Sequence, residues 1–386
     1  MKGFSKTLLS VLIGITPGLG LMAELPTAKP ILGVGSEGKG NKDASQAWKK
    51  LAGSDAAALI SILGEMNDAG PVSANWLRGA VETIVDRTLK SGGELPLEDL
   101  GNFLLDTSNA VKPRNLAFSL IERVKPETAA TLVPGLLNDP SPELRRLAVG
   151  GLADQAEALL KDGKKAEASV VYRQALSFSR EASQTQKIAE ALTDLGQGVD
   201  LPRHFGFLMH WSVIGPFDNT DRGGFAREFP PEREIKLSSS YSGKAGKVSW
   251  RSFVSRHEYG KVDFNKPFGM LKQVVGYAYT EFESPTEQQV ELRLGTKNAW
   301  KVWLNGKLLF ERDEYHRGQR IDQYALPATL KAGMNQILVK SCQNEQEQSW
   351  TKEWEFQLRV CDSTGTAILA ANRPPTPELE KKAAKK

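Results

Sequence analysis

The spacing of apolar residues changes near residue 200, and this change constrains the fold more than any other feature of the sequence. From Ala44 to about Gly196, leucine and alanine recur every three or four residues, and proline or glycine interrupts the pattern. That period indicates amphipathic helices. After Pro202 the chain is rich in aromatic and β-branched residues that alternate with charged ones, which indicates half-buried strands. The sequence therefore predicts an α-then-β chain with two independently folded cores joined near residue 200.

Length and charge narrow the possible partners. A chain of 386 residues is long enough for two or three domains. It carries 50 Lys and Arg against 46 Asp and Glu, a net charge of +4, which is far from the clustered basic face that nucleic-acid binding requires. Its two cysteines exclude a disulfide scaffold and a four-cysteine zinc site. We expect no nucleic-acid partner.

The first residues have the layout of an export signal. Lys2 and Lys6 precede an apolar run over residues 8–15, and Pro17 ends that run before a small residue at a cleavage position. The run is too short to span a membrane, which takes about 20 residues. We expect a cleaved signal peptide over residues 1–23, the alternative being an uncleaved anchor. The mature chain is then secreted, periplasmic or at the cell envelope, with no transmembrane segment.

Residues 24–43 are rich in Gly, Pro and Lys, and we expect a flexible linker there. Within it, residues 33–38 match G-x-G-x-x-G. That fingerprint has meaning only between a buried strand and a helix, and no strand precedes it here. We therefore expect no cofactor.

Residues 44–199 are expected to form a helical repeat domain. Residues 138–149 resemble the second helix of a HEAT repeat, and residues 166–176 resemble a TPR hairpin, in which small residues allow two helices to approach closely around Tyr172. The resemblance implies an α-solenoid with a concave protein-binding face. An irregular helical bundle with the same core is the alternative.

Short strands dominate the second half. Asn305-Gly306 between apolar runs predicts a two-residue type I′ hairpin, and residues 331–335 predict a second tight turn. Many antiparallel strands without intervening helices indicate a β-sandwich or jelly roll. The expected strands cover residues 209–215, 247–254, 272–283, 287–295, 299–304, 307–312, 335–343 and 353–361.

This region resembles a known family. The runs at residues 300–307, 330–335 and 337–340 are similar to the galactose-binding-like jelly rolls appended to many secreted glycosidases. Residues 211–217, with Phe229-Pro230-Pro231-Glu232 and Val248-Ser249-Trp250, look like the opening of that domain in secreted proteins of planctomycete-type bacteria. The resemblance implies a galactose-binding-like β-sandwich over residues 203–372 that binds through loops at one end. It does not name a ligand.

No catalytic or metal-binding pattern is visible in the sequence. His204, His210, His257 and His316 show no zinc-ligand spacing, and no G-x-S-x-G elbow is present. Asp313-Glu314 and the Glu281/Glu283 pair are close in sequence, whereas glycoside cleavage needs two carboxylates that face each other across a cleft. We expect no catalytic residues and no metal.

Aromatic residues in loops are the candidate ligand-binding residues. Trp350 and Trp354 flank a polar loop, and His316 and Arg317 lie in another. An indole can stack on the apolar face of a sugar while polar neighbours bond its hydroxyls. The alternative is that Trp354 belongs to the core and Trp350 caps it. The tryptophans within strands are expected mostly to pack the core: Trp211, Trp250, Trp300 and Trp303.

Two features near the C-terminus complete the predictions. Cys342 and Cys361 lie on the last two expected strands, and export would permit a disulfide, although their positions in a hairpin centred near Ser349 do not oppose one another. Residues 373–386, with three prolines and a Lys-Ala end, are expected to be disordered.

The sequence as a whole predicts an exported, non-catalytic binding or scaffold protein. Its sandwich would contact a glycan or an envelope protein, and its helical repeats a protein partner. The alternatives are a polysaccharide-degrading enzyme with scattered carboxylates, or a structural accessory subunit of one.

Overall fold

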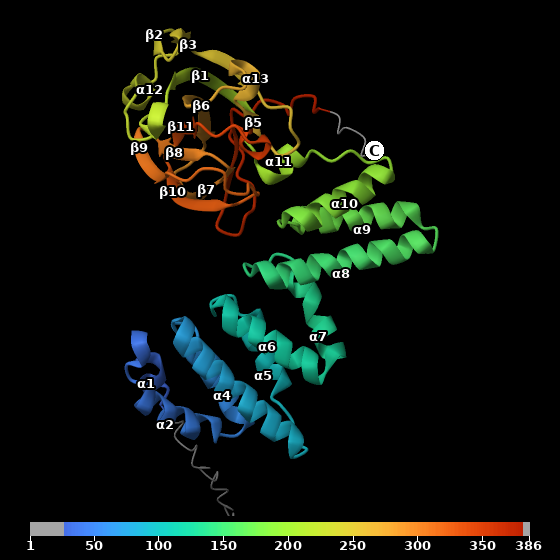
Figure 1. Cartoon of the computed structure of the whole chain (residues 1–386). Coiled ribbons are helices and arrows are strands. Elements are labelled where there is room, and N and C mark those ends of the chain that lie inside the picture. Colours follow the sequence, from blue (N-terminus) through green and yellow to red (C-terminus); the bar gives the residue numbers. More distant parts are fainter. Residues whose placement is uncertain (1–26, 381–386) are drawn as a thin grey trace, which may run out of the picture. The chain divides into compact units, whose positions relative to one another are not determined.

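The structure is a computed structural model that describes residues 27–380, so the expected signal peptide over residues 1–23 lies outside the described part. Helices occupy residues 29–205, and antiparallel strands run from residue 210 to residue 361 (Figure 1). The α-then-β fold class is confirmed. The chain divides into two compact units, Met1–Leu132 and Val133–Lys386, so the last helices belong to the same unit as the strands.

The first unit is built from helices that pack through their apolar faces. In α4, Leu77, Val81, Ile84 and Val85 are fully buried on one face, while Trp76 is partly buried. Consecutive helices pack on each other, as α5 does on α6 and α6 on α7. The helices of this unit are α1 (Lys29–Leu32), α2 (Asn41–Ala52), α3 (Leu59–Glu65), α4 (Pro71–Lys90), α5 (Leu97–Leu105), α6 (Val111–Val124) and α7 (Pro126–Leu132).

Part of the segment that we expected to be a linker, residues 24–43, is helical. Helix α1 buries Ile31 completely, and the hydroxyl of Ser73 on α4 donates a hydrogen bond of 2.8 Å to the Ile31 carbonyl. The buried Ile31 side chain and this hydrogen bond attach the short helix to α4. The glycine motif at residues 33–38 follows a helix rather than a strand, so its context is not that of a dinucleotide site.

The α-helices of the second unit begin with α8 (Pro142–Lys161), α9 (Lys165–Phe178) and α10 (Ala182–Asp194), and the shorter helices α11 (Leu201–Phe205), α12 (Pro230–Arg233) and α13 (Asn265–Phe268) follow. Tyr172 on α9 packs against Val149 on α8 and Ile188 on α10. Ala168 and Ala175, one turn to either side of Tyr172, are fully buried. The small residues thus allow the close helix approach that the sequence predicted.

Two antiparallel sheets follow the helices. The larger sheet has the strand order β4-β1-β6-β11-β8-β9, and the smaller has the order β10-β7-β12-β5. A separate ribbon pairs β2 with β3. The strands are β1 (His210–Asp218), β2 (Ser240–Gly243), β3 (Gly246–Ser249), β4 (Arg251–Val254), β5 (Val262–Asp263), β6 (Val274–Ser284), β7 (Gln288–Thr296), β8 (Ala299–Leu304), β9 (Lys307–Arg312), β10 (Tyr324–Leu330), β11 (Gly333–Gln343) and β12 (Glu355–Cys361).

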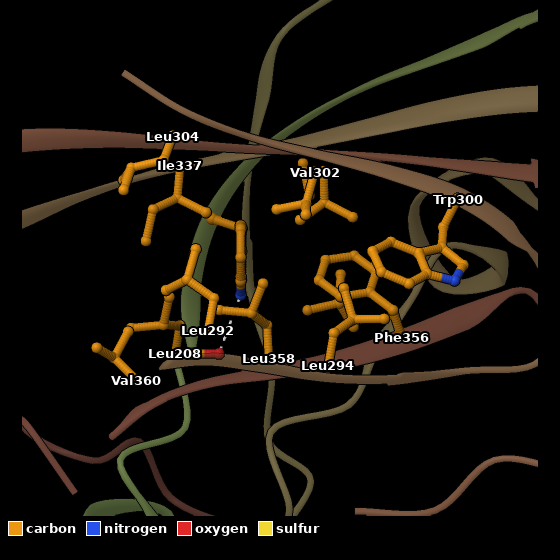
Figure 2. Packing of buried hydrophobic residues seen from close by; sticks show 14 of the residues in the cluster. Leu208, Leu292, Leu294, Trp300, Val302, Leu304, Ile337, Phe356, Leu358 and Val360 are labelled. Carbon is orange, nitrogen blue, oxygen red and sulfur yellow. Dashed lines mark hydrogen bonds between the residues drawn. The ribbon is translucent and has the colours of Figure 1, made fainter. Parts of the chain in front are cut away.

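The main core lies between the two sheets. Figure 2 shows side chains of β8 and β11, such as Trp300 and Ile337, facing side chains of β7 and β12, such as Leu294 and Phe356. Trp211, Trp300 and Trp354 are all buried in this cluster. The expectation that strand tryptophans pack the core is confirmed for Trp211, Trp300 and Trp303, while Trp250 is partly buried.

The larger sheet is also covered on its second face. Phe225 and Phe229, from the segment between β1 and β2, pack there against Tyr277 on β6. Lys340 on β11 is fully buried at this place, and its ammonium group donates to the Phe225 carbonyl at 3.0 Å and to the Glu232 carboxylate at 2.8 Å. Since a buried charge is costly unless it is paired, these bonds account for the position of the covering segment.

The hairpin prediction at Asn305-Gly306 is confirmed. Both residues have positive φ, 53° and 78°, as a type I′ turn requires, and they join β8 to β9. The hairpin expected between residues 335–343 and 353–361 is wrong, because β11 and β12 belong to different sheets. Cys342 and Cys361 are therefore on different sheets, and both are buried free thiols.

A short connection joins α10 to the sandwich. Helix α11 (Leu201–Phe205) ends at Gly206, whose φ of 77° is left-handed and whose missing Cβ would lie 2.8 Å from the Val360 carbonyl. Phe205 and Phe207 pack with Ala189 of α10 and Tyr259 of the sandwich. The change of apolar period near residue 200 thus marks a change of secondary structure, while side-chain packing continues across it.

Arg359 on β12 fixes this connection. Its guanidinium is 1% exposed, donates to Asp322 at 2.6 Å, and also bonds the carbonyls of Phe205 at 3.1 Å and Gly365 at 3.0 Å. It therefore links the end of α11, the loop before β10 and the loop after β12.

The chain after β12 is also held in place, so the prediction of a disordered tail over residues 373–386 is wrong for its described part. Arg373 donates to the Phe207 carbonyl at 2.8 Å, and the backbone N–H of Glu380 donates to Arg256 at 2.9 Å. Low apolar content predicted disorder, but these polar contacts suffice to order residues 373–380. Residues 381–386 lie outside the described part.

We expect His204 on α11 to make folding stability depend on pH. Burial lowers the pKa of His204 to about 4, while its hydrogen bond to the Ser179 carbonyl acts in the opposite direction. Because the unfolded chain binds this proton more readily, the free energy of unfolding falls as the pH drops from about 6.5 to about 4, by about 3 kcal/mol. Urea unfolding at a series of pH values measures this slope. His204→Gln should reduce it, and an unchanged slope in that variant would contradict the assignment.

A second pH effect is expected from Asp322. Burial acts to raise the pKa of Asp322, but the hydrogen bonds from Arg359 and Arg293 outweigh it and lower the pKa. The stabilisation is therefore complete at neutral pH and is lost as the pH falls below about 4. Asp322→Asn should cost about 3 kcal/mol at pH 7, because it leaves buried Arg359 without its carboxylate. The exposed Asp154→Asn is the control, and equal losses in the two variants would refute this role.

Candidate functional site

The structure brings three of the four predicted ligand-binding residues to one loop surface. Trp350 is 58% exposed, and the ring of His316 meets it edge-to-face at a centroid distance of 5.3 Å. Arg317 follows in the chain and pairs with Glu314, with a nitrogen–oxygen distance of 3.0 Å. An exposed indole beside an imidazole is the kind of shelf on which a sugar ring stacks.

Trp354 does not belong to this surface. Its indole is fully buried against Phe264 and Phe268, and its N–H donates to the Ser341 carbonyl at 3.2 Å. Because β12 starts immediately after it, the strand directs this side chain between the sheets. The structure therefore shows the alternative in which Trp354 belongs to the core.

His316 is held in a fixed orientation. Its backbone has a left-handed φ of 60°, and its Nε2 lies 2.8 Å from the side-chain oxygen of Asn344. Since that oxygen can only accept, Nε2 carries the hydrogen. Burial lowers the pKa of His316, although the bond to Asn344 acts in the opposite direction, so the ring is neutral at pH 7. A strained, hydrogen-bonded residue at a loop surface is a feature that clusters at binding sites.

A second candidate site is a cavity of about 330 Å³ at one edge of the larger sheet. The cavity lies between the start of β1, the β6 segment around Tyr279, and residues 370–374 of the chain after β12. That chain runs beside the end of β6, where the N–H of Ala371 donates to the Glu283 carbonyl at 2.9 Å. β1 and the segment around Ala371 thus lie beside different parts of β6, and the cavity lies between these two neighbours.

One residue of the cavity lining carries a polar atom without a hydrogen-bond partner among the described residues. His210, the first residue of β1, is partly buried, and its Nε2 is fully buried with no hydrogen-bond partner among the described residues. Buried polar groups are paired in the great majority of cases, so an exception calls for an explanation. A ligand hydroxyl in the cavity would supply the missing bond.

Glu281 is the one acidic residue in the cavity lining. The hydroxyl of Tyr279 donates to one of its carboxylate oxygens at 2.8 Å. Burial, and then the bond to Glu281, raise the pKa of Tyr279, so the phenol stays a neutral donor. The second oxygen of Glu281 is available for a ligand donor. The hydroxyls of Ser212, Ser252 and Thr280 are further polar groups in the lining.

Aromatic and aliphatic walls complete the cavity. Leu237 is 47% exposed at its rim, and Trp211, whose indole N–H is satisfied by the Leu208 carbonyl at 3.0 Å, lies in its wall. An apolar wall with a few placed polar groups is the usual composition of a small-ligand pocket. Among the described residues, no group of three or more His, Cys, Asp or Glu could hold a metal ion.

Sequence patterns contain only weak signals for this cavity. His210 and Glu281 are separated by 70 positions of chain, and each alone is typical of a solvated strand residue. They come near each other because β1 pairs with β6, with Ser212 opposite Tyr279. The third wall, residues 370–374, includes the first two residues of the tail over residues 373–386 that we expected to be disordered.

We expect His210→Leu to fold as stably as the parent chain or more so, because it removes a buried polar atom that has no partner. His257→Leu is the matched control. The Nδ1 of His257 accepts a hydrogen bond of 3.0 Å from the Tyr259 N–H, so its loss should cost about 1 kcal/mol. Thermal unfolding of both variants measures the difference. A clear loss of stability in His210→Leu would show that His210 has a structural partner.

Comparisons with known proteins assign no family. No protein-family model and no curated protein matches the chain. Solved structures give distant matches: a β-glucuronidase from Ruminococcus gnavus at 12% identity over 40% of this chain and 28% of that one, with a TM-score of 0.24. A β-glucosidase from Kluyveromyces marxianus matches at 11% identity over 75% of this chain and 36% of that one, with a TM-score of 0.25. A GH26-CBM35 β-(1,4)-mannanase from Podospora anserina matches at 14% identity over 30% of this chain and 26% of that one, with a TM-score of 0.16. The chain spans little more than a third of any of these proteins, and at such TM-scores the matches carry no argument about function.

Proposed function

We propose that this protein is an exported, non-catalytic binding protein whose β-sandwich holds a glycan in the cavity beside His210. The observation that carries the proposal is a cavity of about 330 Å³ whose lining includes His210, the residue that carries the unpartnered Nε2. That volume is within the range of small-ligand pockets. The helical repeats would offer a surface to a protein partner.

The chemistry of the lining favours a polyhydroxylated ligand. A sugar hydroxyl both donates and accepts, so it can serve the imidazole of His210 and the free oxygen of Glu281 together. The ring faces of a sugar are apolar and would lie against the wall that contains Trp211 and Leu237. A purely apolar ligand would leave these polar groups buried without partners, which is unfavourable.

A binding role fits the carboxylate content better than a hydrolytic one. Most glycosidases use two carboxyl groups about 5–10 Å apart across the scissile bond. The lining residues of this cavity include Glu281 as the one acid. An assay for released reducing sugar tests the enzyme alternative directly, and turnover of a bound glycan would replace the binding proposal.

Export is part of the proposal and is supported by the sequence of residues 1–23. In the described part of the chain, no helix combines the length and the apolar character that a bilayer crossing demands. The N-terminal sequence of the protein recovered from its host would show whether cleavage occurs after residue 23.

A glycan array probed with the full-length protein, followed by calorimetric titration with the strongest ligand, tests the glycan proposal. We expect His210→Leu and Glu281→Gln each to weaken binding by about tenfold, since each loses a hydrogen bond inside the cavity. Glu283→Gln is the control on the same strand β6, because Glu283 is outside the cavity lining.

Trp350→Ala separates the two candidate surfaces. If the cavity holds the glycan, this variant binds as the parent does. If binding is lost in Trp350→Ala and kept in His210→Leu, the ligand lies on the loop surface and the cavity assignment is overturned. The absence of binding to any glycan would remove the carbohydrate proposal altogether.

A further inference from the structure

A separate cavity of about 280 Å³ lies where helices α8 and α10 begin and the loops after β9 and β12 approach them. Four arginines line it: Arg145 and Arg146 on α8, Arg180 before α10, and Arg293 on β7. None of these residues belongs to the proposed glycan site. The whole cavity belongs to the second unit of the chain.

Arg145 is a buried cation whose hydrogen bonds end on neutral oxygens. Arg145 is 5% exposed, and its guanidinium donates to the Thr364 carbonyl at 2.8 Å and to the Asp139 carbonyl. Burial lowers the pKa of Arg145, the charges of Asp139 and Asp362 act in the opposite direction, and the nearby positive charge of Arg293 adds to the lowering.

Arg180 is partly buried, and its hydrogen bonds also go to neutral oxygens. Its Nε donates to the Thr366 hydroxyl at 3.0 Å, and its Nη1 donates to the carbonyls of Ser177 at 2.8 Å and Ser179 at 2.9 Å. Burial lowers the pKa of Arg180, and the positive charge of Arg145 lowers it further. Two partly desolvated guanidinium groups therefore repel each other across this cavity.

The three carboxylates in the lining are already engaged, and that of Glu143 accepts from the Ser141 hydroxyl at 3.1 Å. Glu181 accepts from the backbone N–H groups of Ser183 at 3.0 Å and Gln184 at 2.8 Å, so it caps its own helix α10. Asp322 accepts from Arg293 at 2.9 Å and from Arg359. These acids stabilise the walls of the cavity, and the negative charge of Asp362 opposes part of the repulsion between Arg145 and Arg180.

We propose that this cavity binds a tetrahedral oxyanion, a sulfate or phosphate group, between Arg145, Arg146 and Arg180. Guanidinium groups recognise such oxyanions through paired N–H donors, and a charge-assisted bond is about twice as strong as a neutral one. The anion would offset the repulsion between buried Arg145 and partly buried Arg180.

Thermal unfolding and calorimetric titration of the full-length protein with sodium sulfate and sodium phosphate test the proposal, with sodium chloride at equal ionic strength as reference. We expect saturable one-to-one binding of sulfate or phosphate and a rise of Tm above that in chloride, since a ligand of the native state stabilises it. Equal responses to all three salts would overturn the site.

Variants locate the binding. Arg146 is exposed, so Arg146→Gln removes a cation from the rim without disturbing the fold, and Arg180→Gln removes a wall residue. Each should weaken sulfate binding by about tenfold. The matched control is Arg173→Gln, an exposed arginine of α9 outside the lining. Unchanged binding in Arg146→Gln together with Arg180→Gln, or equal losses in all three variants, would refute the assignment.

Sodium acetate tests the shape of the ligand. A planar carboxylate has two oxygens, whereas guanidinium groups on α8 and before α10 can together serve three oxygens of a tetrahedral anion. Acetate should therefore bind at least about tenfold more weakly than sulfate. Acetate binding as tight as that of sulfate would overturn the tetrahedral assignment.

Discussion

The buried contact between Arg359 and Asp322 connects most parts of the second unit. Arg359 lies in the middle of the smaller sheet, yet its guanidinium also bonds the carbonyl at the end of α11 and the loop after β12. An arginine in this position must satisfy its donors, because a buried charge without partners is very costly. The helix end, the loop before β10 and the loop after β12 are therefore held at one point, and the oxyanion cavity forms beside them.

The two proposed sites share a structural origin. Each lies where a segment outside the regular sheets packs against a helix or strand: residues 370–374 beside β6 for the glycan cavity, and the loop with Thr364 beside α8 for the oxyanion cavity. The sandwich supplies rigid walls, whereas the added segments supply part of the polar lining. The glycan proposal rests on His210 Nε2, which has no hydrogen-bond partner among the described residues. The oxyanion proposal rests on Arg145 and Arg180, whose hydrogen bonds go to neutral oxygens.

Local sequence patterns predicted the positions of helices and strands well, but they predicted less well which of these segments pair or pack together. The alternation in residues 289–294 and the Asn305-Gly306 turn placed β7, β8 and β9 closely, because these signals depend on neighbouring residues. β10 was not predicted, because Pro327 lies inside it, and that strand is at the edge of its sheet. The ordered chain after β12 was also missed, since its contacts are polar and distant in sequence.

The sequence by itself determined the order of helices and strands, the burial of most tryptophans and the position of one hairpin, since periodicity and turn chemistry act over a few residues. Trp350 and His316 could be proposed as loop residues for the same reason. Only the tertiary structure decided that Trp354 is core, that β11 and β12 lie in different sheets, and that His210 meets Glu281 in one cavity. Those facts depend on which strands pair and where returning segments pack, and contacts between residues far apart in the chain leave no local pattern in it.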